Sequence, residues 1–293
     1  MMSSTLRGYS LDHLTVLRVH GVDAHTFLQG QLTCHLDEVS PQTVRLGAHC
    51  NIKGRMTALC EICQLGADYY LVLPRAIQDS AVKHLTKYAR FSKVELTLLP
   101  EVKVFGFAGA IADITTALDL SKPIEQANAT AADDARICFQ HGRTERWIYF
   151  DLNNHQDLHA LVSDQLCDWQ AQDIQQKLPW LTVDTVNRLI PNEIALEKMG
   201  GVSFNKGCYL GQEIIVRIQH LGQLKKQLAI IEIEGVSPQV ATDIHNTAGK
   251  LCGELVNVAT DSHGKAWGLV LLRTDQANPP LSFVSSAATI RLL

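Results

Sequence analysis

The sequence predicts an α+β fold in which two successive ferredoxin-like units are followed by a small β-barrel. Three observations support this prediction. Residues 1–100 read strand, helix, strand, strand, strand, helix, strand, and a similar order returns over residues 101–223. Residues 224–293 hold only short apolar runs separated by Gly, Asn, Asp and Pro, which favours a barrel. We therefore expect three segments, 1–100, 101–223 and 224–293.

The first segment combines β-type runs with two amphipathic helices. Gly21 ends the first strand, and Asp23 can cap a helix that runs to about Cys34. Gly54 suits the turn of a hairpin. A second helix is expected behind Pro74, with Ile77, Ala81, Leu85 and Tyr88 at helical spacing. The expected strands are Leu14–His20, Thr43–Cys50, Met56–Cys63, Tyr69–Leu73 and the alternating run Val94, Leu96 and Leu98.

The other two segments are interpreted by the same periodicity rules. In the second, we expect a strand at Val102–Ala108, a helix at Ala110–Leu118, a hairpin of Arg136–Gln140 with Arg146–Leu152, and a helix whose face is formed by Leu158, Leu161, Val162, Leu166 and Trp169. In the third, the expected strands are Leu228–Glu234, Lys250–Ala259, Ala266–Arg273 and Thr289–Leu293.

Composition excludes several classes of protein. The chain has 293 residues, of which 46% are hydrophobic and 19% charged, so we expect a folded globular protein. No apolar run approaches the roughly 20 residues of a membrane helix, and the first residues lack the apolar centre of a secretory signal. The net charge of −4 argues against a dedicated nucleic-acid binder. We expect a soluble cytoplasmic protein without a membrane partner.

The eight cysteines are too dilute for a disulfide scaffold and are interpreted as reduced thiols. Cys60 and Cys63 have the C-x-x-C spacing of metal and redox sites. On a strand, however, an offset of three residues puts two side chains on opposite faces. No second C-x-x-C follows, so a structural role is favoured over a metal site.

The densest group of reactive side chains runs from Phe204 to Glu213 and on to Arg217. Two glycines bracket a cation, a thiol and an aromatic ring there, and glycine allows close backbone approach to a ligand. Lys206 lies two residues before Cys208, and a nearby ammonium lowers the pKa of a thiol. The simpler interpretation is a tight turn with a buried cysteine.

The string Lys206-Gly207-Cys208-Tyr209-x-Gly-Gln-Glu resembles the signature of the YgfZ family of folate-binding proteins, which are relatives of the glycine-cleavage aminomethyltransferase and include an iron–sulfur assembly factor. Further blocks appear in the expected order along most of the chain. They are Gly21–Ala24 with Phe27–Thr33, His49–Arg55, Lys87-Tyr88 with Phe91–Val94, and Ile190-Pro191 with Gly200–Phe204.

The resemblance implies a cloverleaf of two α+β domains and a carboxy-terminal β-barrel around a channel for tetrahydrofolate. Lys206 and Cys208 match the family's motif lysine and its candidate reactive thiol. Trp169 matches a tryptophan of the folate channel, where an indole can stack on a flat ring; a core role for Trp169 is the alternative. The remaining residues assigned to the folate site are Tyr209, Gln212, Glu213, Arg217 and Leu14.

Three departures matter, two from the related aminomethyltransferases and one from other YgfZ proteins. Ala58-Leu59 stands where those enzymes carry paired aspartates, and neither side chain can titrate. Gln175 stands where they have a pterin-facing glutamate. Leu14 takes the place of a second channel tryptophan found in some YgfZ proteins. The resemblance therefore makes glycine-cleavage chemistry doubtful for this chain.

These observations favour a tetrahydrofolate-binding accessory protein that supports assembly or repair of iron–sulfur clusters in client enzymes. An effect on tRNA modification would be indirect, through cluster-containing enzymes, without direct contact to nucleic acid. Cluster ligation by this chain is not expected, because no cysteine grouping has the required spacing. The alternatives are a tetrahydrofolate-dependent one-carbon transferase or demethylase, and a scaffold that has lost folate binding.

Overall fold

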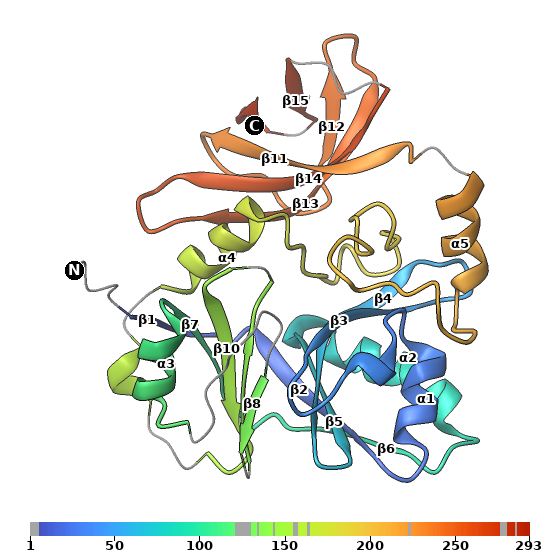
Figure 1. The fold of residues 1–293 in the computed structure, drawn as a ribbon. Coiled ribbons are helices and arrows are strands. Elements are labelled where there is room, and N and C mark those ends of the chain that lie inside the picture. Colours follow the sequence, from blue (N-terminus) through green and yellow to red (C-terminus); the bar gives the residue numbers. More distant parts are fainter. Residues whose placement is uncertain are drawn as a thin grey trace. The chain divides into compact units, whose positions relative to one another are not determined.

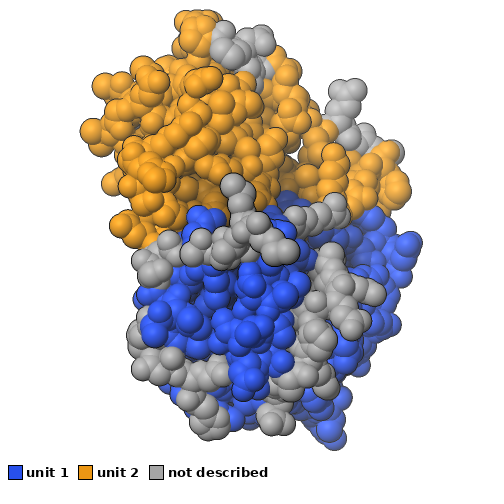
Figure 2. Space-filling model, turned by 60° about the vertical axis from the view of Figure 1, so that its left-hand side comes forward, with its two compact units in different colours: residues 1–50, 57–164, 199–210 blue, residues 51–56, 165–198, 211–293 orange. Residues whose placement is uncertain are grey.

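The computed structural model describes residues 6–120, 130–133, 135–142, 144–154, 158–162, 165–221, 224–275, 280–284 and 286–293. The chain divides into two compact units, coloured separately in Figure 2. Unit 1 comprises residues 1–50, 57–164 and 199–210, and unit 2 comprises residues 51–56, 165–198 and 211–293. Neither unit is continuous in sequence. The three-segment division expected from the sequence stays a prediction.

The first sheet of unit 1 has the strand order β3-β4-β5-β2-β6. Its strands are β2 (Leu14–His20), β3 (Arg45–Cys50), β4 (Met56–Leu65), β5 (Asp68–Pro74) and β6 (Glu95–Leu98), and the helices of this region are α1 (Ala24–Gln31), α2 (Gln78–Ala89) and 3-10 turns at Leu36–Glu38 and Arg75–Ile77. Gly21 precedes α1 with φ of +122°, and a Cβ there would lie 2.3 Å from the carbonyl oxygen of Lys93. Only glycine fits that close approach.

The second sheet of unit 1 has the order β1-β7-β10-β9-β8. Its elements are β1 (Arg7–Ser10), β7 (Val104–Ala108), α3 (Ile111–Ala117), β8 (Thr130–Asp133), β9 (Arg136–Gln140), β10 (Arg146–Asp151) and a 3-10 turn at His159–Leu161. Phe107, Ile114, Leu118 and Tyr149 form part of its core. β1 pairs with β7 across almost a hundred residues, with Arg7 opposite Ala108.

Unit 2 contains a closed barrel with the order β11-β14-β13-β12-β15-β16 (Figure 1). Its elements are α4 (Leu166–Gln175), α5 (Gln212–Leu221), β11 (Lys226–Glu234), β12 (Asp243–Asn246), β13 (Leu251–Thr260), β14 (Ala266–Arg273), β15 (Leu281–Phe283) and β16 (Thr289–Leu292). α4 packs against β13 and β14. A Cβ at Gly268 would lie only 2.8 Å from Ile231 and 3.0 Å from Leu255, so the barrel interior is filled by side chains.

The predicted α+β class and carboxy-terminal barrel are confirmed. One expected helix is wrong: Leu158 and Val162 lie outside any α-helix, with a 3-10 turn at His159–Leu161 between them, and α4 begins only at Leu166. The helical spacing of apolar residues does not distinguish one long helix from two short helical segments. Among the described residues, no helix is long and apolar enough to cross a membrane.

Candidate functional site

The signature residues lie in an irregular stretch that leads into α5. We call Met199–Leu210, the part of this stretch that belongs to unit 1, the motif segment. Backbone hydrogen bonds hold it against the end of α1: Ser203 N donates to Thr33 O over 2.9 Å, and Leu210 N donates to Gly30 O over 3.2 Å. The buried Thr33 hydroxyl also donates to Gly201 O over 2.5 Å. The motif segment is therefore fixed at several points along its length.

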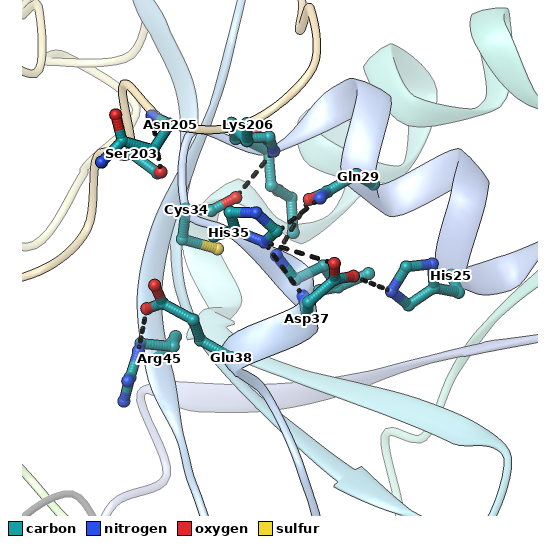
Figure 3. Close-up of polar contacts among 12 residues, drawn as sticks. His25, Gln29, Cys34, His35, Asp37, Glu38, Arg45, Ser203, Asn205 and Lys206 are labelled. Carbon is teal, nitrogen blue, oxygen red and sulfur yellow. Dashed lines mark hydrogen bonds and ion pairs between the residues drawn. The ribbon is translucent and has the colours of Figure 1, made fainter.

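Lys206 provides the central attachment of the motif segment. Its ammonium group Nζ donates to Leu32 O over 2.8 Å and to Cys34 O over 2.7 Å (Figure 3). The ammonium also lies 5.2 Å from the centre of the Tyr209 ring, a cation–π contact. Burial lowers the pKa of Lys206 to about 8. The chain thus keeps a partly desolvated cation here, and the carbonyls that it satisfies directly follow α1.

A polar network surrounds the carbonyls that Lys206 binds. Asp37 pairs with His25 Nε2 over 2.8 Å. Gln29 accepts a hydrogen bond from Leu36 N over 2.9 Å, and its amide nitrogen lies 3.3 Å from His35 Nδ1 (Figure 3). The Asp37 carboxylate acts against the burial effect by raising the pKa of Lys206. The sequence indicated Lys206 and, within the block Phe27–Thr33, Gln29 and Leu32, but not that they meet, because about 170 residues separate them.

Cys208 is the exposed thiol of the chain. All eight cysteines are free; six are buried and Cys167 is half-buried. Burial raises the pKa of Cys34 to about 11, which keeps that thiol protonated despite its proximity to Lys206. The alternative interpretation of Cys208 as a buried residue in a tight turn is wrong, because its side chain is accessible.

The other predicted site residues lie on separate elements. Tyr209 is buried in the motif segment, where desolvation raises the pKa of its phenol. Gln212, Glu213 and Arg217 lie on α5 in unit 2, with Glu213 and Arg217 exposed. Trp169 lies on α4 in unit 2 and is 1% exposed. A half-buried Leu14 begins β2 in unit 1. Among these residues, Lys206 and Tyr209 are in contact within the motif segment.

The positions that depart from the aminomethyltransferase pattern are also defined. Ala58 and Leu59 are both buried in β4. Because consecutive residues of a strand point to opposite faces, both faces of β4 are covered at this point. Gln175 is the exposed last residue of α4.

Two of the sequence blocks meet around a buried imidazole. The His49 ring lies 6.2 Å from the ring of Tyr88 and 6.5 Å from the ring of His84, both on α2. Its Nδ1 forms a short hydrogen bond with the Thr57 hydroxyl. Burial, with a smaller effect of His84, lowers the pKa of His49 to about 3, so the ring is neutral.

The chain resembles known proteins in sequence and in fold. No protein-family model matches the chain. It is 30% identical over 275 residues to the tRNA-modifying protein YgfZ of Vibrio vulnificus strain YJ016, covering 90% of this chain and 83% of the relative. It is 28% identical to the protein of the same name from Yersinia enterocolitica, covering 92% of this chain and 84% of the relative. The crystal structure of the glycine cleavage system aminomethyltransferase T from Bartonella henselae superposes with a TM-score of 0.79 at 12% identity, covering 99% of this chain and 85% of that one. This last likeness shows a shared fold.

We predict that raising the pH from about 8 towards 10.5 stabilises the wild-type protein relative to a Lys206→Met variant. Burial lowers the pKa of Lys206 from 10.5 to about 8 in the folded chain. Between these values the unfolded chain binds more protons, so the free energy of unfolding rises with pH. Below about 8 both states carry the charge, and the cost of burying it is fully present.

The measurement is the urea midpoint of both proteins across this pH range, with Lys225→Met as a control at an exposed lysine. A difference between wild type and Lys206→Met that stays flat or falls with pH contradicts the prediction. The Lys225→Met control is expected to follow the wild type.

Proposed function

The chain belongs to the YgfZ family, and we propose that it is a cytoplasmic, tetrahydrofolate-binding accessory protein that supports assembly or repair of iron–sulfur clusters in client enzymes. The observation that carries the proposal is the signature Lys206–Glu213, in which an exposed thiol stands two residues from an anchored cation. Relatives of this chain are named tRNA-modifying proteins. We attribute such an effect here to tRNA-modifying enzymes that carry clusters.

The residues of the motif segment fit an anionic, aromatic ligand. Lys206 uses two of its three N–H donors on carbonyl groups, which leaves one donor for a carboxylate of folate. The Tyr209 ring supports the ammonium from one side. Bound tetrahydrofolate would supply a carrier for one-carbon groups. The contribution of this chain is to bind and orient that carrier, and Cys208 is the soft nucleophile nearest to the anchored cation in sequence.

Trp169 is the proposed aromatic partner of the folate rings. Its indole is almost fully enclosed, so stacking requires that one face of the ring be uncovered when ligand enters. The alternative is a purely structural role for Trp169 in the packing of α4. In that case its substitution changes the stability of the fold but not the affinity for the ligand. The resemblance also assigns Gln212, Glu213, Arg217 and Leu14 to folate binding.

A tetrahydrofolate-dependent one-carbon transferase or demethylase is the second candidate function. The fold shared with an aminomethyltransferase and the accessible thiol favour it. The side chains of Ala58 and Leu59 argue against it. A general acid or base must exchange a proton near the operating pH, and neither of these two side chains can do so. A scaffold without folate binding is the third candidate, which a negative titration would favour.

We predict that tetrahydrofolate binds and that Trp169→Ala weakens binding about 2- to 12-fold, from loss of an aromatic stack of roughly 0.5–1.5 kcal/mol. Titration calorimetry measures the dissociation constants. Because removing a buried tryptophan can destabilise the fold, Trp169→Phe is measured beside it and should retain most of the affinity. Trp267→Phe, on the barrel, is the matched control. Absence of saturable binding by the wild type at millimolar ligand rejects the folate proposal.

We also predict that the purified protein lacks aminomethyltransferase activity, because Ala58 and Leu59 cannot exchange protons. The assay follows methylene-tetrahydrofolate formation from aminomethylated lipoyl carrier protein. Turnover of methylamine-type substrates is tested in parallel, since it would identify a demethylase. Robust product formation in either assay would favour the transferase candidate over the accessory protein.

The third prediction for this function concerns the thiol. Cys208→Ala should leave folding and folate affinity nearly unchanged, because the side chain is exposed, but should abolish support of iron–sulfur enzymes in cells. The measurement is the activity of a cluster-dependent enzyme in a deletion strain complemented with each variant at equal protein level.

Cys208→Ser and Cys167→Ala serve as comparisons. Serine keeps the size of cysteine but is a poor soft nucleophile, so Cys208→Ser should also fail, whereas Cys167→Ala at the half-buried thiol should rescue. Full rescue by both Cys208 variants would remove the thiol from the mechanism and leave a folate-binding protein.

A further inference from the structure

The helix α2 and the turn after it carry charges of a single sign over fifteen residues. From Ser80 to Val94 the chain has four cations and no carboxylate, although its net charge is −4. The cations are Lys83, Lys87, Arg90 and Lys93, and all four are exposed. Within the described part of the chain, none of them forms an ion pair.

The helix gathers three of these cations on one side. Lys83, Lys87 and Arg90 follow the spacing i, i+4, i+7, which places them along a single face at 3.6 residues per turn. The other side of α2 is buried, with Ala81 and Leu85 each 1% exposed. The cations are therefore held in a row by a helix that is itself fixed to its unit.

An aromatic ring stands at the end of this row. Phe91 is 96% exposed and follows Arg90 directly. The next part of the turn is rigidly attached, because Lys93 N donates to the Asp23 carboxylate over 2.6 Å and Asp23 N donates to Lys93 O over 3.3 Å. Exposing a whole phenyl ring to water is unfavourable, so covering the Phe91 ring with a ligand would lower the free energy.

We propose that this surface, the basic face of Lys83, Lys87, Arg90, Phe91 and Lys93, binds a single-stranded segment of nucleic acid. Lysine and arginine side chains neutralise backbone phosphates, and an exposed aromatic ring is a stacking platform for an unpaired base. The same combination of cations and aromatic ring is the general means by which proteins hold single strands without reading their sequence.

Charge and burial favour this ligand over a membrane surface. An interfacial helix inserts its apolar side into lipid, but the apolar side of α2 is already packed against its unit. Two carboxylates flank the basic face in sequence: Asp79 in the first turn of α2, and Glu95, which pairs with His20. A third, that of Asp23, is held at the turn by the backbone nitrogen of Lys93. Asp79 and Glu95 limit the length of the basic face to the stretch between them. An acidic protein could pair with the cations, but it has no base to stack on the exposed ring of Phe91.

The inference goes beyond the proposed function, in which any effect on tRNA modification is indirect. It also refines what the net charge predicted, since a chain that is acidic on average carries a local basic face. Folate binding and strand binding involve different residues, so either can fail without the other.

The test is fluorescence anisotropy of a short labelled single strand of mixed sequence, as RNA and as DNA, with the full-length protein. We expect saturable binding. The logarithm of the association constant should fall with the logarithm of the salt concentration, with a slope of about −3, as for four phosphate contacts to a single strand. Lys87→Glu/Arg90→Glu should abolish most binding. Phe91→Leu should weaken it about 5-fold or more, while Phe91→Trp retains it.

The matched control is Lys225→Glu/Lys250→Glu, which makes the same change of net charge at two exposed lysines of unit 2 and should leave binding intact. Equal loss in the control pair, or no binding at low salt, overturns the proposal. So does binding of anionic phosphatidylglycerol vesicles or of polyglutamate in preference to the strands. Any difference in affinity between the RNA and the DNA strand identifies which kind of nucleic acid the basic face binds. Thermal unfolding confirms that each variant is folded.

Discussion

The hydrogen bonds of Lys206 to the carbonyls of Leu32 and Cys34 are the constraint on which the site depends. They join residues 174 and 172 positions apart, so the conformation of the motif segment depends on long-range contacts with the chain that follows α1. Burying the ammonium is costly, as its lowered pKa shows, and the carbonyls and the Tyr209 ring offset part of that cost. With this anchor in place, Cys208 is presented to solvent on a fixed backbone.

Periodicity predicted most regular elements well, because each carries enough residues to show its repeat. The bounds of β2, β9 and β14 agree with the expected strands Leu14–His20, Arg136–Gln140 and Ala266–Arg273. The short strands β1, β8, β12 and β15 were not predicted. Three or four residues show too little alternation to be distinguished from a loop, and β1 exists because β7, almost a hundred residues later, supplies its hydrogen-bond partners.

The candidate site was less predictable than the fold for a physical reason. A signature can indicate Lys206, but the groups that satisfy it are main-chain carbonyls, and every residue has one. The same limit applies to charge. A net charge of −4 says nothing about distribution, and only the helix of α2 with its buried side shows that Lys83, Lys87 and Arg90 form one row.

The buried pair Ala58 and Leu59 bears on the proposal that this chain shares the fold of an aminomethyltransferase without its reaction. Both side chains are enclosed in β4, and a carboxylate at either position would lose its hydration unless a new partner were built around it. Apolar residues therefore fit this strand better than acids do. The chain shares its fold with an aminomethyltransferase at 12% identity, and it has an anchored cation and an accessible thiol. Because Ala58 and Leu59 are buried and have no proton to exchange, this part of β4 contributes packing, which agrees with the proposal of an accessory protein.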